Sequence, residues 1–309
     1  MNGKVLIIDD VHTSLCDGLA DLGYEVDYLP TIIASEVPGI IEKYVGLVLR
    51  SKLAVDGKLL TQASQLKFIG RAGAGLDQLE MEAISARGIA VVNAPEGNRD
   101  ALGEHMTGML LALLHSIPKA NNEVRLKKWD REGNRGVELG SLCVGLIGYG
   151  MMGSAFASKL AGFGCEVLAY DKYKAGFGTG AVEEVSLEGL FERADVLSLH
   201  VPLTDETKGW IDGSFIDKFR KPIYLLNSAR GKVVVLADLA DRLASGRVRG
   251  ACLDVLENEK LANFSDEEND TFDRLSKFNN VIFTPHVAGW TIESYRRIST
   301  VLLDKISKL

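Results

Sequence analysis

A glycine-rich run in the middle of the chain has the spacing of a dinucleotide-binding turn. Residues 143–153 read CVGLIGYGMMG, so Gly148, Gly150 and Gly153 follow an apolar stretch and precede a helical segment at 154–163. The first glycine permits a tight turn, the second lets the backbone approach a pyrophosphate, and the third permits close packing of helix on strand. Amide groups at the start of the helix then face the anion.

An acid at the end of the next expected strand indicates which dinucleotide binds. Asp171 closes the apolar stretch 166–171, where a carboxylate can accept both hydrogen bonds of an adenosine ribose diol. A 2'-phosphate at this place would meet a like charge, although Lys172 and Lys174 could reduce that preference. The sequence therefore predicts NAD as the cofactor. The alternative is that Asp171 is only a turn residue at a strand end.

Two other strand ends carry side chains suited to the reduction of a carbonyl group. Arg230 follows the expected strand 223–227, and His286 lies in a turn after the expected strand 281–284. A guanidinium offers a planar fork of donors that fits a carboxylate and an adjacent carbonyl oxygen. Hydride delivery to that carbonyl also requires a proton donor, and histidine titrates near neutral pH. We expect these roles, although arginines more often form surface ion pairs and histidines are more often structural.

The remaining acid and histidines are interpreted in relation to this pair. An adjoining carboxylate such as Glu259 would stabilise the imidazolium of His286 and keep the acid loaded for reduction. His200 also follows an expected strand, so by position alone it is a rival proton donor. The other histidines fall in helical segments and are interpreted as surface or core residues: His12, His105 and His115.

The elements that must position these groups are short strands that alternate with helix-sized segments. This alternation is typical of a parallel sheet with right-handed crossovers and helices on both faces. The first series of expected strands covers residues 4–9, 24–29, 46–50, 66–70 and 89–93. The second series covers residues 143–148, 166–171, 196–201, 223–227, 250–255 and 281–284. Two series predict an α/β protein with two domains, as 309 residues also favour.

Two further segments carry no assigned chemistry. Residues 98–128 are predicted to form one long helix, buried at a domain or subunit interface through apolar side chains at helical spacing. These side chains are Met106, Met109, Leu110, Leu113 and Leu114. The acid-rich stretch 263–273 is interpreted as a solvated loop.

Composition excludes several classes of protein. Lys and Arg number 35 against 42 Asp and Glu, a net charge of -7 that would repel nucleic acid. The four cysteines form no CxxC pair, so we expect no metal site, no disulfide framework and a cytoplasmic location. The N-terminus does not resemble a signal peptide and no apolar run reaches 18 residues, so no membrane association is expected.

Four motifs together resemble the D-isomer-specific 2-hydroxyacid dehydrogenases. They are the glycine-rich run with its acid, NSARG at 227–231, LDVLENE at 253–259 and TPHVAG at 284–289. Their order and spacing match jointly, and the resemblance covers essentially the whole chain. Within the family the chain looks most similar to phosphoglycerate dehydrogenases that lack a C-terminal regulatory domain.

The resemblance implies roles for individual residues. Arg230 would clamp the substrate, Glu259 would tune the histidine, and His286 would be the acid in reduction and the base in oxidation. His200 would lie on the cofactor side. The implied NAD contacts are Gly148, Gly150, Met151, Met152, Gly153, Asp171, His200, Val201, Pro202, Ser228, Ala229, Asp254, Ala288 and Gly289.

The resemblance also implies a layout. Two doubly wound parallel-sheet domains are expected, with a Rossmann NAD-binding domain at 98–286 inserted into a flavodoxin-like substrate-binding domain formed by 1–97 and 287–309. The amphipathic tail at 291–309 would then pack back on the first sheet. We expect a homodimer.

The implied substrate contacts leave strands of the first sheet. They are Arg50, Ser51, Arg71, Gly73, Ala74, Gly75 and Asn98. Backbone amides at Ala74 and Gly75 could bind a carboxylate, and a phosphorylated substrate would need cations such as Arg50 and Arg71, with Lys52 and Arg131 as further candidates. Lys260 stands where the family usually has proline, which bears on substrate choice.

The expected reaction interconverts D-3-phosphoglycerate and 3-phosphohydroxypyruvate, as in serine biosynthesis, with a small-molecule acid as the only substrate partner. One alternative is reduction of glyoxylate or hydroxypyruvate. From other classes, the alternatives are an NAD-sensing, corepressor-like binding protein and a Rossmann methyltransferase that binds a different adenosine ligand.

Overall fold

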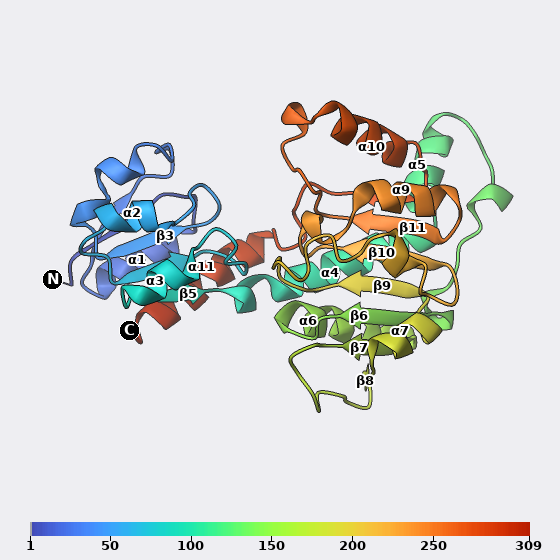
Figure 1. The fold of residues 1–309 in the computed structure, drawn as a ribbon, viewed down its shortest axis with the longest axis horizontal. Coiled ribbons are helices and arrows are strands. Elements are labelled where there is room, and N and C mark those ends of the chain that lie inside the picture. The colour runs from blue at the N-terminus through green and yellow to red at the C-terminus, as the bar shows by residue number, and fades with distance from the viewer. Residues whose placement is uncertain (1) are drawn as a thin grey trace. The chain divides into compact units, whose positions relative to one another are not determined.

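The structure is a computed structural model that describes residues 2–309, and it contains two compact α/β units (Figure 1). Unit 1 comprises the chain up to Arg99 together with Trp290–Leu309, and unit 2 comprises Asp100–Gly289. Both boundaries fall slightly later in the chain than the expected 97/98 and 286/287. Helix α4 (Pro95–Leu114) carries the chain across the first of them.

Unit 1 is built on a five-stranded parallel sheet. Its strands are β1 (Lys4–Ile7), β2 (Glu25–Tyr28), β3 (Gly46–Leu49), β4 (Phe68–Arg71) and β5 (Ala90–Asn93). They lie in the order β2-β1-β3-β4-β5, which is the flavodoxin-like order. The helices assigned wholly to this unit are α1 (Thr13–Asp21), α2 (Gly57–Gln62), α3 (Met81–Ala86) and α11 (Ile292–Ile306).

The C-terminal helix α11 completes the core of unit 1. Thr291 and Ser294 form a capping box at its start. Ile298, Leu302 and Ile306 are buried against the strand residues of β1, β3 and β4 on one face of the sheet. The tail therefore packs on the first sheet as the sequence predicts, and the chain returns to unit 1 after completing unit 2.

Unit 2 is built on a seven-stranded parallel sheet. Its strands are β6 (Cys143–Ile147), β7 (Glu166–Tyr170), β8 (Glu183–Glu184), β9 (Val196–Leu199), β10 (Ile223–Asn227), β11 (Val248–Leu253) and β12 (Val281–Phe283). Their order is β12-β11-β10-β9-β6-β7-β8, so the direction of winding reverses between β6 and β9. Ligands of open α/β sheets bind beyond the carboxyl ends of the strands at such a reversal.

Helices cover both faces of this sheet (Figure 1). Those that connect its strands are α6 (Met151–Leu160), α7 (Leu187–Arg193), α8 (Gly213–Ile216), α9 (Leu236–Ala244) and α10 (Asp266–Ser276). Two apolar clusters result, one on each face, and α4 contributes Met106, Met109 and Leu110 to one of them. Both doubly wound sheets agree with the predicted fold class.

The prediction of one helix over 98–128 is wrong. The chain breaks after α4 and resumes as α5 (Ile117–Arg125), because Ser116 takes a left-handed conformation with φ of 52°. Pro118 then occupies the first turn of α5, where a backbone N–H group would have no partner within the helix. The same residue could not continue α4, because proline has no N–H to donate within a helix. The apolar stripe on α4 is nevertheless buried, as expected.

The interpretation of 263–273 as a loop is also wrong. Helix α10 begins inside it, with a capping box in which Ser265 and Glu268 bond each other's backbone amides. Its first turn is acidic, which suits the positive end of a helix dipole. The short edge strand β8 was not expected either, since two glutamates give no strand signal.

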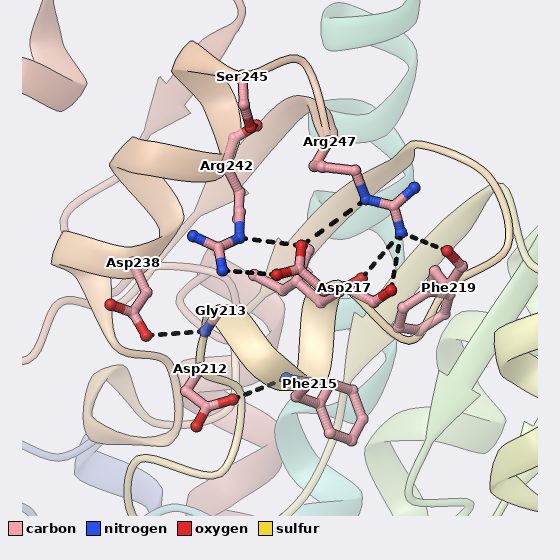
Figure 2. A network of polar contacts seen from close by, with 10 residues as sticks. Asp212, Gly213, Phe215, Asp217, Phe219, Asp238, Arg242, Ser245 and Arg247 are labelled. Carbon is pink, nitrogen blue, oxygen red and sulfur yellow. Dashed lines mark hydrogen bonds and ion pairs between the residues drawn. The ribbon is translucent and has the colours of Figure 1, made fainter.

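A polar network fixes the helices that flank β10 in the sequence (Figure 2). Arg242 on α9 donates two hydrogen bonds to Asp217 just beyond α8, at 3.0 and 2.6 Å, and these bonds lower the pKa of that carboxyl. Asp238 accepts from the amide of Gly213 at 2.8 Å, which joins the start of α8 to α9. Arg247 donates to the carbonyl of Phe219.

Among the helices of residues 2–309, none is long and apolar enough to cross a membrane.

Candidate active site

The groups singled out in unit 2 all lie at one edge of its sheet. Because the strands are parallel, the residues that follow β6, β7, β9, β10, β11 and β12 emerge on the same side. These residues include the glycine turn, Asp171, His200, Ser228, Asp254 and Thr284. The sheet therefore gathers the expected cofactor and catalytic groups although they are spread over the sequence.

The glycine turn has the shape that a pyrophosphate requires. Gly148 has φ of 93°, and a Cβ there would lie 2.4 Å from the carbonyl oxygen of His200. A Cβ on Gly153 would lie 2.1 Å from the carbonyl oxygen of Gly148, so helix α6 is packed directly on the turn. A Cβ on Gly150 would meet nothing within 4 Å, and Gly150 is the N-cap of α6 without a side-chain cap. The space beside Gly150 faces the positive end of that helix.

Two buried polar atoms at the same sheet edge have no hydrogen-bond partner among the described residues. They are Nδ1 of His200, after β9, and Oγ of Ser228, after the adjacent strand β10. Buried polar groups are almost always paired, so a polar ligand bound at this edge would supply the partners that these two atoms lack. The glycine turn and these two atoms together fit a bound dinucleotide.

Asp171 follows β7 and anchors its own turn. Its carboxylate accepts hydrogen bonds from the amides of Tyr149 at 2.8 Å, Tyr173 at 2.9 Å and Lys174 at 3.1 Å. Two carboxylate oxygens offer about four lone pairs, so a ribose hydroxyl can still donate to it. Lys172 is paired with Glu206 at 2.6 Å and Lys174 donates to the carbonyl of Tyr149 at 3.1 Å. Both neighbouring lysines are thus engaged, which favours NAD over NADP.

Burial disfavours His200 as a proton donor. Burial lowers its pKa from 6.5 to about 4, and Phe156 packs on its ring at a centroid distance of 5.6 Å. Its Nε2 lies 3.0 Å from Oγ of Ser198. The imidazole is therefore neutral at physiological pH, which removes the rival to His286.

The turn that carries Arg230 is held by Asn227. The Asn227 side chain accepts from the amide of Ala229 and donates to the carbonyl of Arg230, both at 3.0 Å. A Cβ on Gly231 would lie 1.8 Å from the carbonyl oxygen of Leu256. Only glycine permits this approach, which packs the Arg230 turn against the chain that follows β11.

Glu259 and His286 are in contact. Nδ1 of His286 lies 3.0 Å from Oε2 of Glu259, and both side chains are about half exposed. The other acid of this run, Glu257, turns away and accepts from the amide of Leu236 at 3.4 Å; burial raises its pKa. The side chain of Asn258 accepts from the amide of Lys260 at 3.0 Å, a bond that a proline at this position could not make.

The turn that carries His286 has a strained backbone and is held by hydrogen bonds to a buried carboxylate. His286 has φ of 55°, a conformation that few residues other than glycine adopt. Asp254 is almost completely buried, and its carboxylate accepts from the amides of Val287 and Ala288, both at 2.9 Å. Thr284 donates to the same carboxylate at 2.5 Å. The expected contact of Asp254 with the cofactor stays a prediction, and the structure shows its carboxylate bound to the turn that carries His286.

Sequence reasoning missed His105 and Thr284. His105 was interpreted as a surface or core residue, but its Nε2 lies 3.1 Å from Oγ1 of Thr284 and 3.7 Å from Oδ1 of Asp254. No local signal identifies this contact, because α4 and β12 are remote in the sequence.

The other expected cofactor residues are distributed along the same edge. Met151 and Met152 open α6, Val201 and Pro202 follow β9, and Ala288 is buried in the His286 turn next to Gly289. Their contacts with NAD stay predictions. Arg131 lies elsewhere, exposed beside the short 3-10 turn Glu132–Asn134.

The expected substrate residues of unit 1 lie at the carboxyl edge of that unit's own sheet. They follow β3 (Arg50, Ser51), close or follow β4 (Arg71, Gly73, Ala74, Gly75), or open α4 after β5 (Asn98). The guanidinium of Arg71 lies over Gly73, where a Cβ would be 1.5 Å from its Nη1. Oδ1 of Asn98 is buried without a partner among residues 2–309, which again indicates a polar ligand.

Arg50 is held in place by an aromatic ring. Its guanidinium lies 3.9 Å from the ring centre of Trp290, and its amide donates to Asp9 at 2.6 Å. Burial lowers the pKa of this guanidinium. Lys52, by contrast, donates to the main-chain carbonyls of Ile8 and Pro30, so its ammonium is committed to the fold.

Within residues 2–309 no cluster of three or more His, Cys, Asp and Glu side chains is arranged to hold a metal ion.

Comparisons with known proteins relate the chain to one enzyme family. Residues 107–288 match the D-isomer specific 2-hydroxyacid dehydrogenase, NAD binding domain. The chain is 34% identical over 305 residues to a D-3-phosphoglycerate dehydrogenase of Archaeoglobus fulgidus, covering 98% of this chain and 56% of that protein. It is 34% identical over 273 residues to a hydroxypyruvate reductase of Thermotoga maritima, covering 88% and 87%.

The fold matches that of a D-lactate dehydrogenase of Aquifex aeolicus solved with NAD and lactic acid, with a TM-score of 0.86, 28% identity and coverage of 98% and 94%. The chain belongs to the D-isomer specific 2-hydroxyacid dehydrogenase family, and its cofactor is NAD. It spans about half the length of the curated phosphoglycerate dehydrogenases that it matches.

The neutral state of His200 predicts a pH-dependent loss of stability. Below pH 6.5 the unfolded chain binds a proton at His200 that the native state, with a pKa of about 4, does not bind. Stability therefore falls as the pH drops from 6.5 towards 4, by about 3 kcal/mol in all, and this contribution levels off below that range.

His200→Gln removes this titration and keeps a side chain able to bond Ser198. Urea unfolding of both proteins between pH 7 and pH 4 should show a shallower decline for the variant. Parallel declines would show that His200 protonates equally well in both states.

Proposed function

We propose that the protein is an NAD-dependent dehydrogenase that interconverts a D-2-hydroxy acid and its 2-oxo acid. The observation that carries this proposal is the contact between His286 and Glu259, on the sheet edge that also carries Arg230 and the cofactor turn. β10 and β12 flank β11, so the two strand ends that carry Arg230 and His286 are about 10 Å apart.

The chain's own residues account for binding and proton transfer. Arg230 binds the carboxylate and the oxygen of the adjacent carbonyl, which polarises that carbonyl. Reduced NAD, when bound, supplies a hydride to the carbonyl carbon. Nε2 of His286 gives its proton to the carbonyl oxygen, which becomes the hydroxyl. Glu259 orients the ring through Nδ1 and stabilises its charged form, and oxidation uses the same groups in reverse.

The preferred substrate pair is D-3-phosphoglycerate and 3-phosphohydroxypyruvate. Relatives named for this activity align over nearly the whole chain. Arg50, Arg71 and the unpartnered oxygen of Asn98 give the carboxyl edge of unit 1 the cations and polar groups that a phosphorylated acid requires. In this assignment Arg50 and Arg71 bind the substrate anion.

Hydroxypyruvate reduction is the second candidate. It is favoured by the hydroxypyruvate reductase of Thermotoga maritima, because that relative is matched over 87% of its length. Both candidate reactions use the same groups of unit 2. They differ in whether unit 1 must provide cations that bind a phosphate.

The test of the activity is NADH oxidation with 3-phosphohydroxypyruvate, hydroxypyruvate, glyoxylate and pyruvate. His286→Ala removes the proton donor and Arg230→Ala the carboxylate clamp, so each should lower kcat/KM at least about 100-fold while NADH still binds. Lys58→Gln, at an exposed site, is the control. Full activity in either active-site variant would refute its role. Tight NADH binding without turnover in the wild type would favour the NAD-sensing binding protein.

Substrate choice is tested by removing charge from unit 1. Arg50→Gln and Arg71→Gln should each raise KM for 3-phosphohydroxypyruvate roughly tenfold or more, since each removes a charge-assisted contact. KM for glyoxylate, which has no phosphate, should change less than about threefold. Equal losses for both substrates would contradict a phosphate role and favour the smaller acids.

The expected homodimer is supported by an exposed apolar segment. None of the residues of α5 is buried, and four large apolar side chains lie exposed on or after it. They are Ile117 at 53%, Val124 at 51%, Leu126 at 72% and Trp129 at 80%. Several large exposed apolar side chains within one short segment are typical of a contact surface. We propose that α5 and the residues up to Trp129 bind a second copy of the chain.

Sedimentation velocity tests this surface. The wild type should sediment as a dimer, and Leu126→Ser with Trp129→Ser should sediment as a monomer because the apolar contact is lost. Ile292→Ser, which removes an equally exposed apolar side chain from α11, is the matched control and should remain dimeric. A dimer in the double variant would place the interface elsewhere.

A further inference from the structure

The segment that carries His286 is joined to α4 by a line of hydrogen-bonded side chains that ends at the buried carboxylate of Asp254. β11 and β12 pair in parallel, with Leu253 opposite Phe283, so Asp254 and Thr284 follow side by side. The amide of His286 donates to the carbonyl of Asp254 at 2.8 Å. From α4, His105 and Met109 reach Thr284 one helical turn apart.

The direction of each hydrogen bond in this line follows from the chemistry of its members. A carboxylate only accepts, so the hydroxyl of Thr284 gives its single proton to Asp254, at 2.5 Å. The contact of the same hydroxyl with the sulfur of Met109, at 3.6 Å, is then a packing contact. Nε2 of His105, at 3.1 Å, faces a hydroxyl oxygen that has no proton left, so this nitrogen must donate. The order is His105 to Thr284 to Asp254.

The end of this line holds the catalytic turn. The Asp254 carboxylate that receives the Thr284 proton also accepts from the amides of Val287 and Ala288. Hydrogen bonds in series strengthen one another, so the donor from His105 makes Thr284 a better donor to Asp254. A buried carboxylate that loses a donor is expensive, and it would turn to recover one.

The turn needs this support because His286 is in a left-handed conformation, with φ of 55°. Such a conformation is strained for a residue with a Cβ and persists only where the surroundings enforce it. If the amides of Val287 and Ala288 were released, the backbone would relax. The imidazole would then leave both Glu259 and the carbonyl oxygen that it must protonate.

We propose that His105 is a positioning residue for His286, acting through Thr284 and Asp254. It touches neither substrate nor cofactor in this role. Its Nε2–H fixes the Thr284 hydroxyl, which orients the carboxylate that clamps the His286 turn. The inference rests on the proposed role of His286 as the acid and base of the reaction.

The decisive comparison is between two amides at position 105. The amide nitrogen of glutamine lies the same number of bonds from Cα as Nε2 of histidine. The amide nitrogen of asparagine lies the same number of bonds from Cα as Nδ1 of histidine. His105→Gln should therefore keep kcat within about twofold of the wild type. His105→Asn and His105→Leu should lower kcat at least about tenfold, because a displaced catalytic group costs rate.

A second pair of variants tests the middle of the line. Thr284→Val keeps the shape of the side chain but removes the hydroxyl, so it should lower kcat at least as much as His105→Leu. Thr284→Ser keeps the hydroxyl and should have a kcat close to that of the wild type. In all variants KM for the oxo acid and the affinity for NADH, measured by fluorescence, should change less than about threefold. His115→Leu, the same change at an exposed histidine just after α4, should leave kcat unchanged.

A readout without activity keeps the inference testable if the reaction differs from the one proposed. The chain has five histidines, so the ring signals in a histidine-labelled NMR spectrum can be assigned by single substitutions. The His286 ring signal should move in His105→Leu and Thr284→Val and return in His105→Gln and Thr284→Ser.

The outcomes separate the two proposals. Loss of activity in His286→Ala but wild-type kcat and an unmoved His286 signal in both His105→Leu and Thr284→Val would overturn the positioning role. Full activity in His286→Ala would overturn the acid–base role instead, and the NMR signal would then decide the positioning role by itself. A rise in KM or a loss of NADH binding at constant kcat would identify His105 as a structural residue only.

Discussion

The parallel register of β10, β11 and β12 is the constraint on which the site depends. It places three consecutive strand ends side by side, and each leads to one group of the proposed chemistry: Arg230, the run to Glu259, and His286. The register is set by buried apolar residues on both faces of the sheet, not by the polar residues beyond it. A slip of one residue would turn these apolar side chains to the wrong faces, so core packing and catalytic geometry are secured by the same interactions.

Backbone strain and close backbone contacts occur in the turns that follow the strands of unit 2. Gly148 and Gly231 permit backbone contacts that any Cβ would block. At position 286 the backbone is left-handed, a conformation that favours glycine, yet the residue is histidine. A glycine could relieve the strain but could not transfer a proton. The buried carboxylate of Asp254 offsets that cost with two amide contacts, which explains why an acid is buried beneath the turn.

The sequence was sufficient for those parts of the site that depend on local spacing. The glycine turn, the acid after β7 and the strand ends at Arg230 and His286 follow from chain geometry, and the contact of Glu259 with His286 is present as expected. The break at Ser116 was missed because the apolar periodicity of α4 favoured one continuous helix and nothing in it indicates a left-handed residue shortly before Pro118. His105 was missed because its partners lie on a strand end remote in sequence, and helical position alone cannot distinguish such a histidine from one on the surface.

The division of the chain into two units also divides reaction type from substrate choice. The proposed reaction needs a cofactor cradle, a carboxylate clamp and a proton donor, and the candidates for all three lie on one sheet edge of unit 2. The groups that would distinguish a phosphate from a hydroxyl or a hydrogen are side chains of unit 1, such as Arg50 on its Trp290 platform. Under the proposed assignment, changes in unit 1 would alter which acid is reduced, while the groups proposed for hydride and proton transfer all belong to unit 2. Relatives named for phosphoglycerate and for hydroxypyruvate resemble the chain to the same degree, at 34% identity each, because overall identity reflects the shared frame and does not report substrate choice.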